Sequence, residues 1–262
     1  MGDSPKYKVR LLLSYDGSDF GGWQRQKQAK PTIQGTLEQA LSRIFSEEIR
    51  ICGSGRTDAG VHAVSQTAHF WTSKEPSRFN LMRSLNALTP DSIALKGAWL
   101  APAEFHALAS AERKTYKYLI YQSPIPSALK ARYALWERSP LNLDYLNETA
   151  QYLVKKQDFS SFQTSGTEVK STIREVFSAN WSRRRDRLIQ FQIEGDGFLK
   201  QMVRTIVGTQ LHLHHNGLPT SEFEKIIQSC DRRIAKESAP AQGLYLYRVS
   251  YPSELDNKCR KI

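Results

Sequence analysis

The sequence predicts an α+β fold with two similar α/β halves, residues 1–108 and 109–262, whose sheets join around a central cleft. Two observations support this prediction. The 262 residues are enough for one large domain or two modest ones. Strand-like and helical patterns follow one another as β-α-β-β-α-β in the first half and as β-α-β-β-α-α-β in the second. The halves therefore share an outline, although no sequence repeat relates them.

The first half carries four strand-like segments and two helical ones. Apolar runs mark the strands. The first helix is predicted from Thr32, which can cap it, and from an apolar stripe at helical spacing. In chain order the expected elements are a strand Tyr7–Tyr15, a helix Thr32–Phe45, strands Ile49–Cys52 and Val61–Trp71, a helix Phe79–Leu88 and a strand Ile93–Leu100.

The second half is predicted by the same patterns and closes with a short tail. In chain order we expect a strand Arg113–Tyr121, a helix Leu143–Leu153, strands Ile173–Ser182 and Leu188–Glu194, helices over Gly197–Gly208 and Thr220–Cys230, and a final strand that ends at Tyr251. The tail, Lys258–Ile262, is expected to be mobile because chain ends with few apolar residues are seldom held in place.

The charge balance indicates a polyanionic partner. Lys and Arg together number 37 and Asp and Glu 26, which gives a net charge of +11. This excess does not distinguish RNA from DNA or from an acidic membrane surface. The three cysteines form no Cys-x-x-Cys pair, no hydrophobic signal region begins the chain, and no apolar run is long enough to span a membrane. We therefore expect a soluble, cytoplasmic protein without a membrane partner.

One glycine-framed loop is the strongest candidate site. Gly53, Gly55 and Gly60 surround Arg56 and Asp58. Glycine permits positive φ and close backbone approach, so the loop can bend tightly and admit a bulky ligand. If the segment is extended, the arginine and the aspartate project to the same side. A carboxylate and a guanidinium placed in this way indicate a binding or catalytic site.

Other functions for this loop are weaker or remain open. Asp58 stands where a dinucleotide-binding fingerprint needs its third glycine, and no Gly-Lys-Ser/Thr follows as in a Walker A loop. A phosphate-loop nucleotide enzyme is therefore disfavoured. An ordinary turn, in which Thr57 or Asp58 bonds its own backbone, remains open. An anion-binding nest without catalysis also remains open.

The segment Gly55–His62 closely resembles the signature loop of the TruA family of tRNA pseudouridine synthases. The resemblance runs from Tyr15 to Tyr251, and it is carried by further segments that include Phe20–Gln26, Phe105–Ala107, Gly197–Gly208 and Ala239–Leu246.

The resemblance implies both a fold and an activity. The implied fold is the pseudouridine synthase fold, a mixed α/β structure with mainly antiparallel sheet and a central RNA-binding cleft, and the implied active form is a homodimer. The implied activity is isomerisation of uridine to pseudouridine at positions 38, 39 and 40 of the anticodon stem and loop of tRNA. No small-molecule cofactor or metal takes part in this chemistry.

The resemblance also implies the site residues. Asp58 matches the catalytic aspartate, and Arg56 is its neighbour in the loop. Tyr116 matches the active-site tyrosine, Arg204 the active-site arginine, and Leu244 an apolar residue that lines the pocket. A carboxylate can serve as a nucleophile or a base, and we expect Asp58 to be the catalytic nucleophile.

Structural alternatives remain for several of these segments. Tyr116 could be a packing residue of a strand, and Arg204 a snorkelling surface arginine. The aromatic and polar segment Phe20–Gln26 suits either nucleic-acid contact or a capped hairpin or surface turn. The basic turn Arg183–Arg187 could bind phosphates or be a solvated hairpin tip.

Two further hypotheses complete the sequence-based predictions. His212, His214 and His215 hint at a metal, but no acidic or cysteine ligand accompanies them, so a metal site there is disfavoured. A non-catalytic basic tRNA-binding protein or RNA chaperone on the same scaffold is the alternative to an enzyme. The co-occurrence of Asp58 with a matching tyrosine and arginine disfavours it, since binding alone does not require that set.

Overall fold

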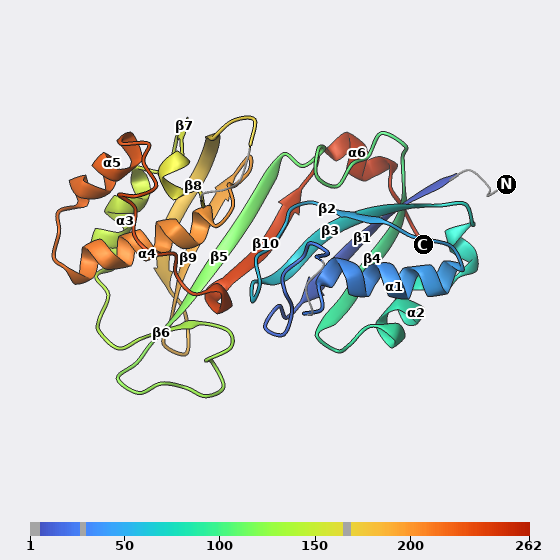
Figure 1. Ribbon diagram of the computed structural model, residues 1–262, viewed down its shortest axis with the longest axis horizontal. Helices are drawn as coiled ribbons and strands as arrows, with labels where there is room; N and C mark the ends of the chain where they lie inside the picture. The colour runs from blue at the N-terminus through green and yellow to red at the C-terminus, as the bar shows by residue number, and fades with distance from the viewer. Residues whose placement is uncertain (1–5, 27–29, 165–168) are drawn as a thin grey trace. The chain divides into compact units, whose positions relative to one another are not determined.

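A computed structural model describes residues 6–26, 30–164 and 169–262 (Figure 1). The chain divides into two compact units, one made of Met1–Glu112 with Leu246–Ile262 and one of Arg113–Tyr245. The first boundary thus falls after Glu112 rather than after residue 108, and the C-terminal segment returns to the first unit. It does so because the final strands join the sheet of that unit.

The first unit is built on a sheet with the strand order β11-β4-β1-β3-β10, and β2 pairs with β3. The pairings of β1, β2 and β11 are antiparallel, as the resemblance implied. The central strand β1 lies between β3 and β4, and its Val9, Leu11 and Leu13 are fully buried. The strands are β1 Tyr7–Tyr15, β2 Ile51–Gly53, β3 His62–Thr72, β4 Ile93–Ala101, β10 Leu244–Ser250 and β11 Arg260–Lys261.

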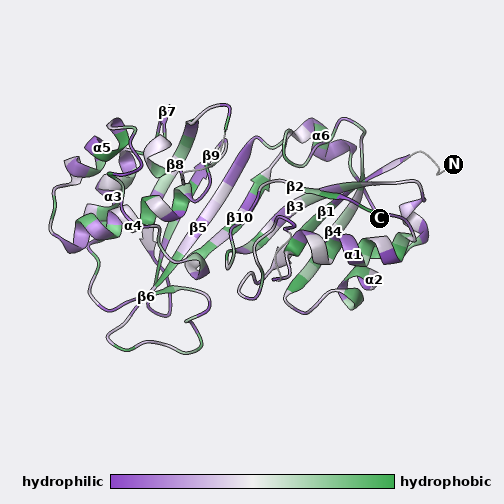
Figure 2. Cartoon of the chain, in the orientation of Figure 1, coloured by the Kyte–Doolittle hydropathy of each residue, from purple (hydrophilic) through white to green (hydrophobic). Residues whose placement is uncertain are grey.

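Helices α1 and α2 lie on one face of this sheet (Figure 1). Thr32 caps α1 as predicted, since its hydroxyl accepts the N–H of Gly35 at 3.2 Å. The apolar side of α1 is buried and ends in Phe45, whose ring meets Phe70 of β3 edge-on. Figure 2 shows hydrophobic and hydrophilic residues alternating along the helices, as expected for amphipathic elements. The helices are α1 Ile33–Phe45, α2 Leu81–Leu88, α6 Ser253–Lys258 and a 3₁₀ turn η1 Pro76–Arg78.

The second unit has a sheet with the order β5-β9-β8-β7, and β6 pairs with β5 in parallel. The pairings β5–β9, β9–β8 and β8–β7 are antiparallel. Helices α3, α4 and α5 pack against one another, and α3 also packs on β8. The elements are β5 Arg113–Gln122, β6 Leu135–Glu137, α3 Leu143–Gln151, β7 Lys156–Asp158, η2 Ser160–Phe162, β8 Ile173–Arg183, β9 Leu188–Gly195, α4 Met202–His215, α5 Thr220–Gln228 and η3 Ala241–Gly243.

The predicted α+β class is confirmed, and the predicted elements occur in the predicted order, but the structure adds β6, β7, α6 and β11. Two further predictions need correction. Helix α4 begins at Met202 rather than near Gly197, because Gln201 has φ 61° and a left-handed residue cannot continue a right-handed helix. The expectation of a mobile tail was wrong. Strand β11 pairs with β4, and the N–H of Ile262 donates to the carbonyl oxygen of Ala98 at 3.1 Å.

Within the described residues, the helices are too short or too polar to cross a membrane.

Candidate active site

The loop Ser54–Val61 joins β2 to β3, and the segment that follows β1 packs closely against it. A Cβ atom on Gly17 would lie 2.0 Å from the carbonyl oxygen of Val61. Gly22 has φ +91°, and a Cβ atom there would lie 2.6 Å from the carbonyl oxygen of Thr57. Glycine is required at both positions because any larger side chain would collide with the loop backbone. The loop is therefore pressed into one conformation from the side of β1.

A buried polar network holds the same loop from the side of β3. The hydroxyls of Thr57 and Tyr15 lie 2.9 Å apart. Ser54 donates to the side-chain oxygen of Gln66 at 2.6 Å, and the amide nitrogen of Gln66 donates to the carbonyl oxygen of Gly55 at 2.9 Å. Burial raises the pKa of Tyr15 to about 12, so this residue stays a neutral phenol. Satisfied buried networks of this kind fix a unique geometry.

The network determines which side chains of the loop reach the surface. Thr57 is buried, whereas Arg56 before it is exposed and Asp58 after it is half-buried. The carbonyl oxygen of Asp58 accepts the N–H of Val61 at 3.1 Å, which closes the turn. The arrangement fixes the backbone on both sides of Asp58, which is neither buried in the core nor fully exposed.

The aromatic residues of Phe20–Gln26 support this loop rather than offering a surface for bases. Phe20 is 4% exposed and Trp23 is 2% exposed. The N–H of Trp23 donates to the carbonyl oxygen of Thr57 at 3.0 Å, and a Cβ atom on Gly53 would lie 2.6 Å from the indole ring. Stacking of a nucleobase on these two rings is excluded by their burial. The polar end of the segment, Gln24–Gln26, is half-buried to exposed.

Tyr116 lies on β5 opposite Ile193 of β9. Its ring meets the edge of the Phe198 ring at a centroid distance of 5.1 Å, and 8% of the residue is exposed. Its neighbour on the same face, Tyr118, is fully buried. Tyr116 is thus packed, as one of the two alternatives predicted, and retains a small solvent-accessible surface.

Arg204 occupies the first turn of α4 and is anchored to a neighbouring segment. Its Nε donates to the carbonyl oxygen of Ala239 at 2.7 Å, and the N–H of Ala239 donates to the carbonyl oxygen of Arg204 at 2.9 Å. A Cβ atom on Gly208, one turn further along, would lie 2.0 Å from the carbonyl oxygen of Glu237. The half-buried arginine is therefore fixed at Nε, unlike a snorkelling arginine, whose head group extends into water.

Leu244 begins β10 and is 6% exposed. The preceding turn crosses the ring of Tyr118 so closely that a Cβ atom on Gly243 would lie 2.6 Å from it. The hydroxyl of Tyr118 donates to the carbonyl oxygen of Pro240 at 2.8 Å. Burial raises the pKa of Tyr118 far above its usual value, and the positive charge of Arg204 opposes this effect. Strand β5, the start of α4 and residues 239–244 are thus tied together.

The structure distributes the sequence-predicted site residues over both units. Tyr116, Arg204 and Leu244 belong to the second unit. Arg204 contacts Ala239 of the segment that ends in Leu244, whereas Tyr116 packs against Phe198. Asp58 and Arg56 belong to the first unit, on the loop between β2 and β3.

The basic turn Arg183–Arg187 is exposed throughout. The guanidinium of Arg183 donates to the side chain of Gln122, and that of Arg187 donates to the hydroxyl of Ser123, both at 3.2 Å. These contacts hold the turn against the end of β5. Because the turn stays exposed, both predicted alternatives remain open: it could bind phosphates or be a solvated hairpin tip.

Protein groups engage two histidines of the C-terminal end of α4. Nε2 of His214 accepts the N–H of Asn142 at 3.0 Å. Nε2 of His215 lies 3.1 Å from the carboxylate of Glu137. These contacts occupy nitrogen atoms that a metal would need.

A family model for tRNA pseudouridine synthases matches residues 12–107 and 149–252. The chain belongs to the tRNA pseudouridine synthase family. Two curated tRNA pseudouridine synthase A proteins show the extent of the similarity. The protein of Bdellovibrio bacteriovorus is 49% identical over 259 residues, which cover 97% of this chain and 99% of that protein. The protein of Ruminiclostridium cellulolyticum is 41% identical over 244 residues, which cover 93% and 99%.

Membership of the tRNA pseudouridine synthase family makes the chain an isomerase. The matched ranges include the loop of Asp58 as well as Arg204 and Leu244, whereas Tyr116 lies between them.

Sequence analysis missed the network that positions the loop. The available signal was Gln66 in the middle of a predicted strand, since a polar residue that becomes buried needs partners. The partners Tyr15 and Ser54 lie on other elements, and only the strand pairing brings them to Gln66.

Proposed function

We propose that this chain isomerises uridine to pseudouridine at nucleotides 38, 39 and 40 in the anticodon stem and loop of tRNA, with Asp58 as the catalytic nucleophile. The observation that carries the proposal is the loop of Asp58. In this chain a buried network holds Thr57, and the adjacent Asp58 is half-buried rather than enclosed in the core. The net charge of +11 suits a polyanionic RNA substrate.

The reaction conserves every atom and electron of the nucleoside. The bond between ribose C1′ and base N1 breaks, the base turns, and a bond forms between C1′ and C5. C5 loses a proton and N1 gains one, so the product has the mass of the substrate. Asp58 acts as the nucleophile, so that breaking of the C1′–N1 bond and formation of the C1′–C5 bond are separate steps.

The three residues of the second unit bind the substrate in this proposal. Tyr116 stacks on the target base, since its ring is already held by packing against Phe198. Arg204 provides a positive charge whose position is fixed by the bond from Nε to Ala239. Leu244 supplies an apolar contact.

Arg56 assists the removal of the target base from its helix. A uridine paired in a stem must be flipped out, which costs a few kcal/mol. Arg56 is exposed and lies two residues before Asp58, so its side chain can enter the space that the base vacates. Arg56→Ala should slow conversion of a paired uridine more than conversion of an unpaired one. Arg50→Ala, which removes another exposed arginine of the same unit, serves as the control; equal losses on both substrates would contradict insertion.

The decisive experiment maps pseudouridine by carbodiimide labelling of tRNA transcripts incubated with the wild-type chain or with Asp58→Asn. We expect labelling at nucleotides 38 to 40 with the wild-type chain and none with the variant, which should still bind tRNA. If the wild-type chain bound tRNA and converted no uridine, the non-catalytic alternative would replace this proposal.

The active form proposed is a homodimer that works in the cytoplasm on tRNA. The resemblance to the family supports this assembly. Sedimentation equilibrium of the pure protein should give twice the mass of one chain, and a monomer at working concentration would contradict it.

A further inference from the structure

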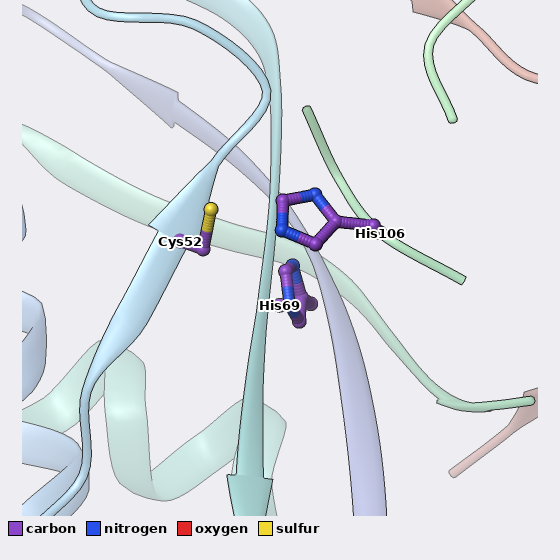
Figure 3. A group of neighbouring side chains, drawn as sticks. All are labelled: Cys52, His69 and His106. Carbon is purple, nitrogen blue, oxygen red and sulfur yellow. The ribbon is translucent and has the colours of Figure 1, made fainter. Parts of the chain in front are cut away.

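A thiol and two imidazoles converge in the first unit, away from the residues assigned above. Cys52 of β2 lies directly opposite His69 of β3 in the strand pairing, so the two side chains share one face of the sheet. His106 reaches the same place from the segment that follows β4. One ligand atom from each residue lies within 4.8 Å of the other two (Figure 3).

Backbone N–H groups orient both rings. The N–H of Ala107 donates to Nδ1 of His69 at 3.2 Å. The N–H groups of Leu108 and Ala109 donate to Nδ1 of His106 at 3.2 and 3.1 Å. Because Nδ1 of each ring accepts a backbone N–H, the proton of each neutral ring lies on Nε2, which is the nitrogen left for the cluster. Figure 3 shows the ring of His106 directed toward the other two residues.

The segment that carries His106 is itself held in place. The ammonium group of Lys8 donates to the carbonyl oxygens of Ala103 and Phe105. The N–H of His106 donates to the hydroxyl of Ser110 at 3.0 Å. The imidazole rings of His69 and His106 meet edge-on with their centroids 4.7 Å apart. Backbone hydrogen bonds and strand pairing therefore bring the three residues together, rather than the conformation of one flexible side chain.

The three side chains of the cluster are of kinds that bind metal ions. Thiolate sulfur and imidazole nitrogen are the ligands that Zn²⁺ prefers in proteins. A bound cation also stabilises the thiolate form of cysteine.

We propose that Cys52, His69 and His106 form a zinc-binding site with a fourth position open to water. Zn–N distances of about 2.0–2.1 Å and a Zn–S distance of about 2.3 Å place tetrahedral ligand atoms roughly 3.5 Å apart, so the ligands must close in by about 1 Å. His106, half-buried and the least enclosed of the three, makes this movement. Zn²⁺ replaces the proton of the thiol, which passes to the solvent. On each ring the proton moves from Nε2 to Nδ1, so a neutral imidazole binds the ion through Nε2 and the backbone bond to Nδ1 is given up.

The ion would connect β2 and β3 to the segment after β4. Cys52 lies immediately before the loop that carries Asp58, so a bound ion would restrain the entry to that loop. The site supplies no group to the isomerisation. It can therefore be present or absent independently of the function proposed above.

The test uses the full chain, freed of metal with a chelator and titrated with Co²⁺ as a spectroscopic substitute for Zn²⁺. We expect one ion per chain and a near-ultraviolet thiolate-to-Co²⁺ charge-transfer band. Cys52→Ser should abolish the band, and His106→Ala should weaken binding at least tenfold. Cys230→Ser, which changes an exposed cysteine of the other unit, should change neither.

Zinc content measured after dialysis against micromolar Zn²⁺ provides a second readout. Equal zinc content in the wild-type chain, Cys52→Ser and His106→Ala would overturn the proposal, as would a wild-type chain without zinc. Because His106 lies outside the strands of the sheet, its variant keeps the test valid if Cys52→Ser fails to fold. Zinc binding by a chain that converts no uridine would refute only the proposed enzymatic function.

Discussion

Nε of Arg204 donates a hydrogen bond to the carbonyl oxygen of Ala239, and the N–H of Ala239 returns one to the carbonyl oxygen of Arg204. These reciprocal bonds, 2.7 and 2.9 Å long, join the first turn of α4 to the segment before β10. A guanidinium held in this way keeps its position when substrate arrives. Its conformation is therefore set by the fold before binding, which is the arrangement expected of a preorganised charge.

Replacing Arg204 should impair turnover more than stability. Arg204→Gln removes the charge, and we expect kcat to fall by about 100-fold or more, as when one preorganised donor is lost. The carbonyl oxygen of Ala239 would lose a donor, which costs roughly 1–3 kcal/mol. Steady-state kinetics and urea unfolding measure the two effects. Arg204→Lys should recover part of the rate; equal rates for the two variants would show that charge is not what Arg204 contributes.

A methyl group at position 208 should displace the segment that anchors Arg204. The Cβ atom of Gly208→Ala would lie 2.0 Å from the carbonyl oxygen of Glu237, so residues 237–239 must move away from α4. We expect a loss of about 1–3 kcal/mol in unfolding free energy, typical of overpacking, together with reduced activity. Gly35→Ala provides a matched helical control in α1, where the nearest atom would be 3.1 Å away. A variant at position 208 as stable as wild type would contradict this packing.

The hydroxyl pair of Thr57 and Tyr15 should be energetically coupled. Thr57→Val and Tyr15→Phe each remove one partner of a buried hydrogen bond, and each should cost roughly 1 kcal/mol. The double variant should cost less than the sum by about 1 kcal/mol. Additive losses in urea unfolding would mean that this bond does not hold the loop. The single variants should also lower kcat with little change in KM, because the loop positions Asp58.

Because of Lys114, the free energy of unfolding should increase as the pH becomes alkaline. Burial, with the positive charge of Arg174 adding to it and Asp196 opposing it, lowers the pKa of Lys114 from 10.5 to about 8. Below pH 8 both folded and unfolded states carry the proton, and the full cost of the buried charge is present. Between about pH 8 and 10.5 the unfolded state binds more protons than the folded state, so the free energy of unfolding increases with pH.

Comparison with Lys114→Met isolates this effect, since all other groups titrate in both proteins. The variant should be more stable at pH 7 by on the order of 1–3 kcal/mol, and the difference should shrink by pH 10. Lys225→Met, at an exposed lysine paired with Glu222, should show no such trend. A gap between wild type and Lys114→Met that is the same at both pH values would rule out the lowered pKa.

Local sequence signals were sufficient to predict elements that are stabilised by their own residues. Strand β1 was predicted with its observed bounds because an apolar run fills it, and α1 was predicted because Thr32 caps an apolar stripe. The glycine-framed loop was recognisable because Gly53, Gly55 and Gly60 surround two charged residues. The fold class followed from the order of these elements.

Features that depend on tertiary contacts were not predictable from local patterns. Strand β11 is two residues long and forms because β4 offers it an edge. The delayed start of α4 depends on the left-handed backbone of Gln201, and glutamine gives no local signal for that conformation. For the segment of Trp23, the sequence left nucleic-acid contact and a surface turn both open. The burial of Trp23 depends on how the segment after β1 folds back onto the loop.

The first unit is interrupted in the sequence by the whole of the second. Strands β10 and β11, which cover edges of β3 and β4, follow residue 243, whereas the loop of Asp58 is made near the beginning. A growing chain on the ribosome therefore exposes unpaired strand edges until its last segment emerges, and such edges invite pairing with other chains. Translation that stops early leaves a fragment with the aspartate loop but an unfinished sheet, which favours its aggregation or proteolysis over a partly active product on RNA.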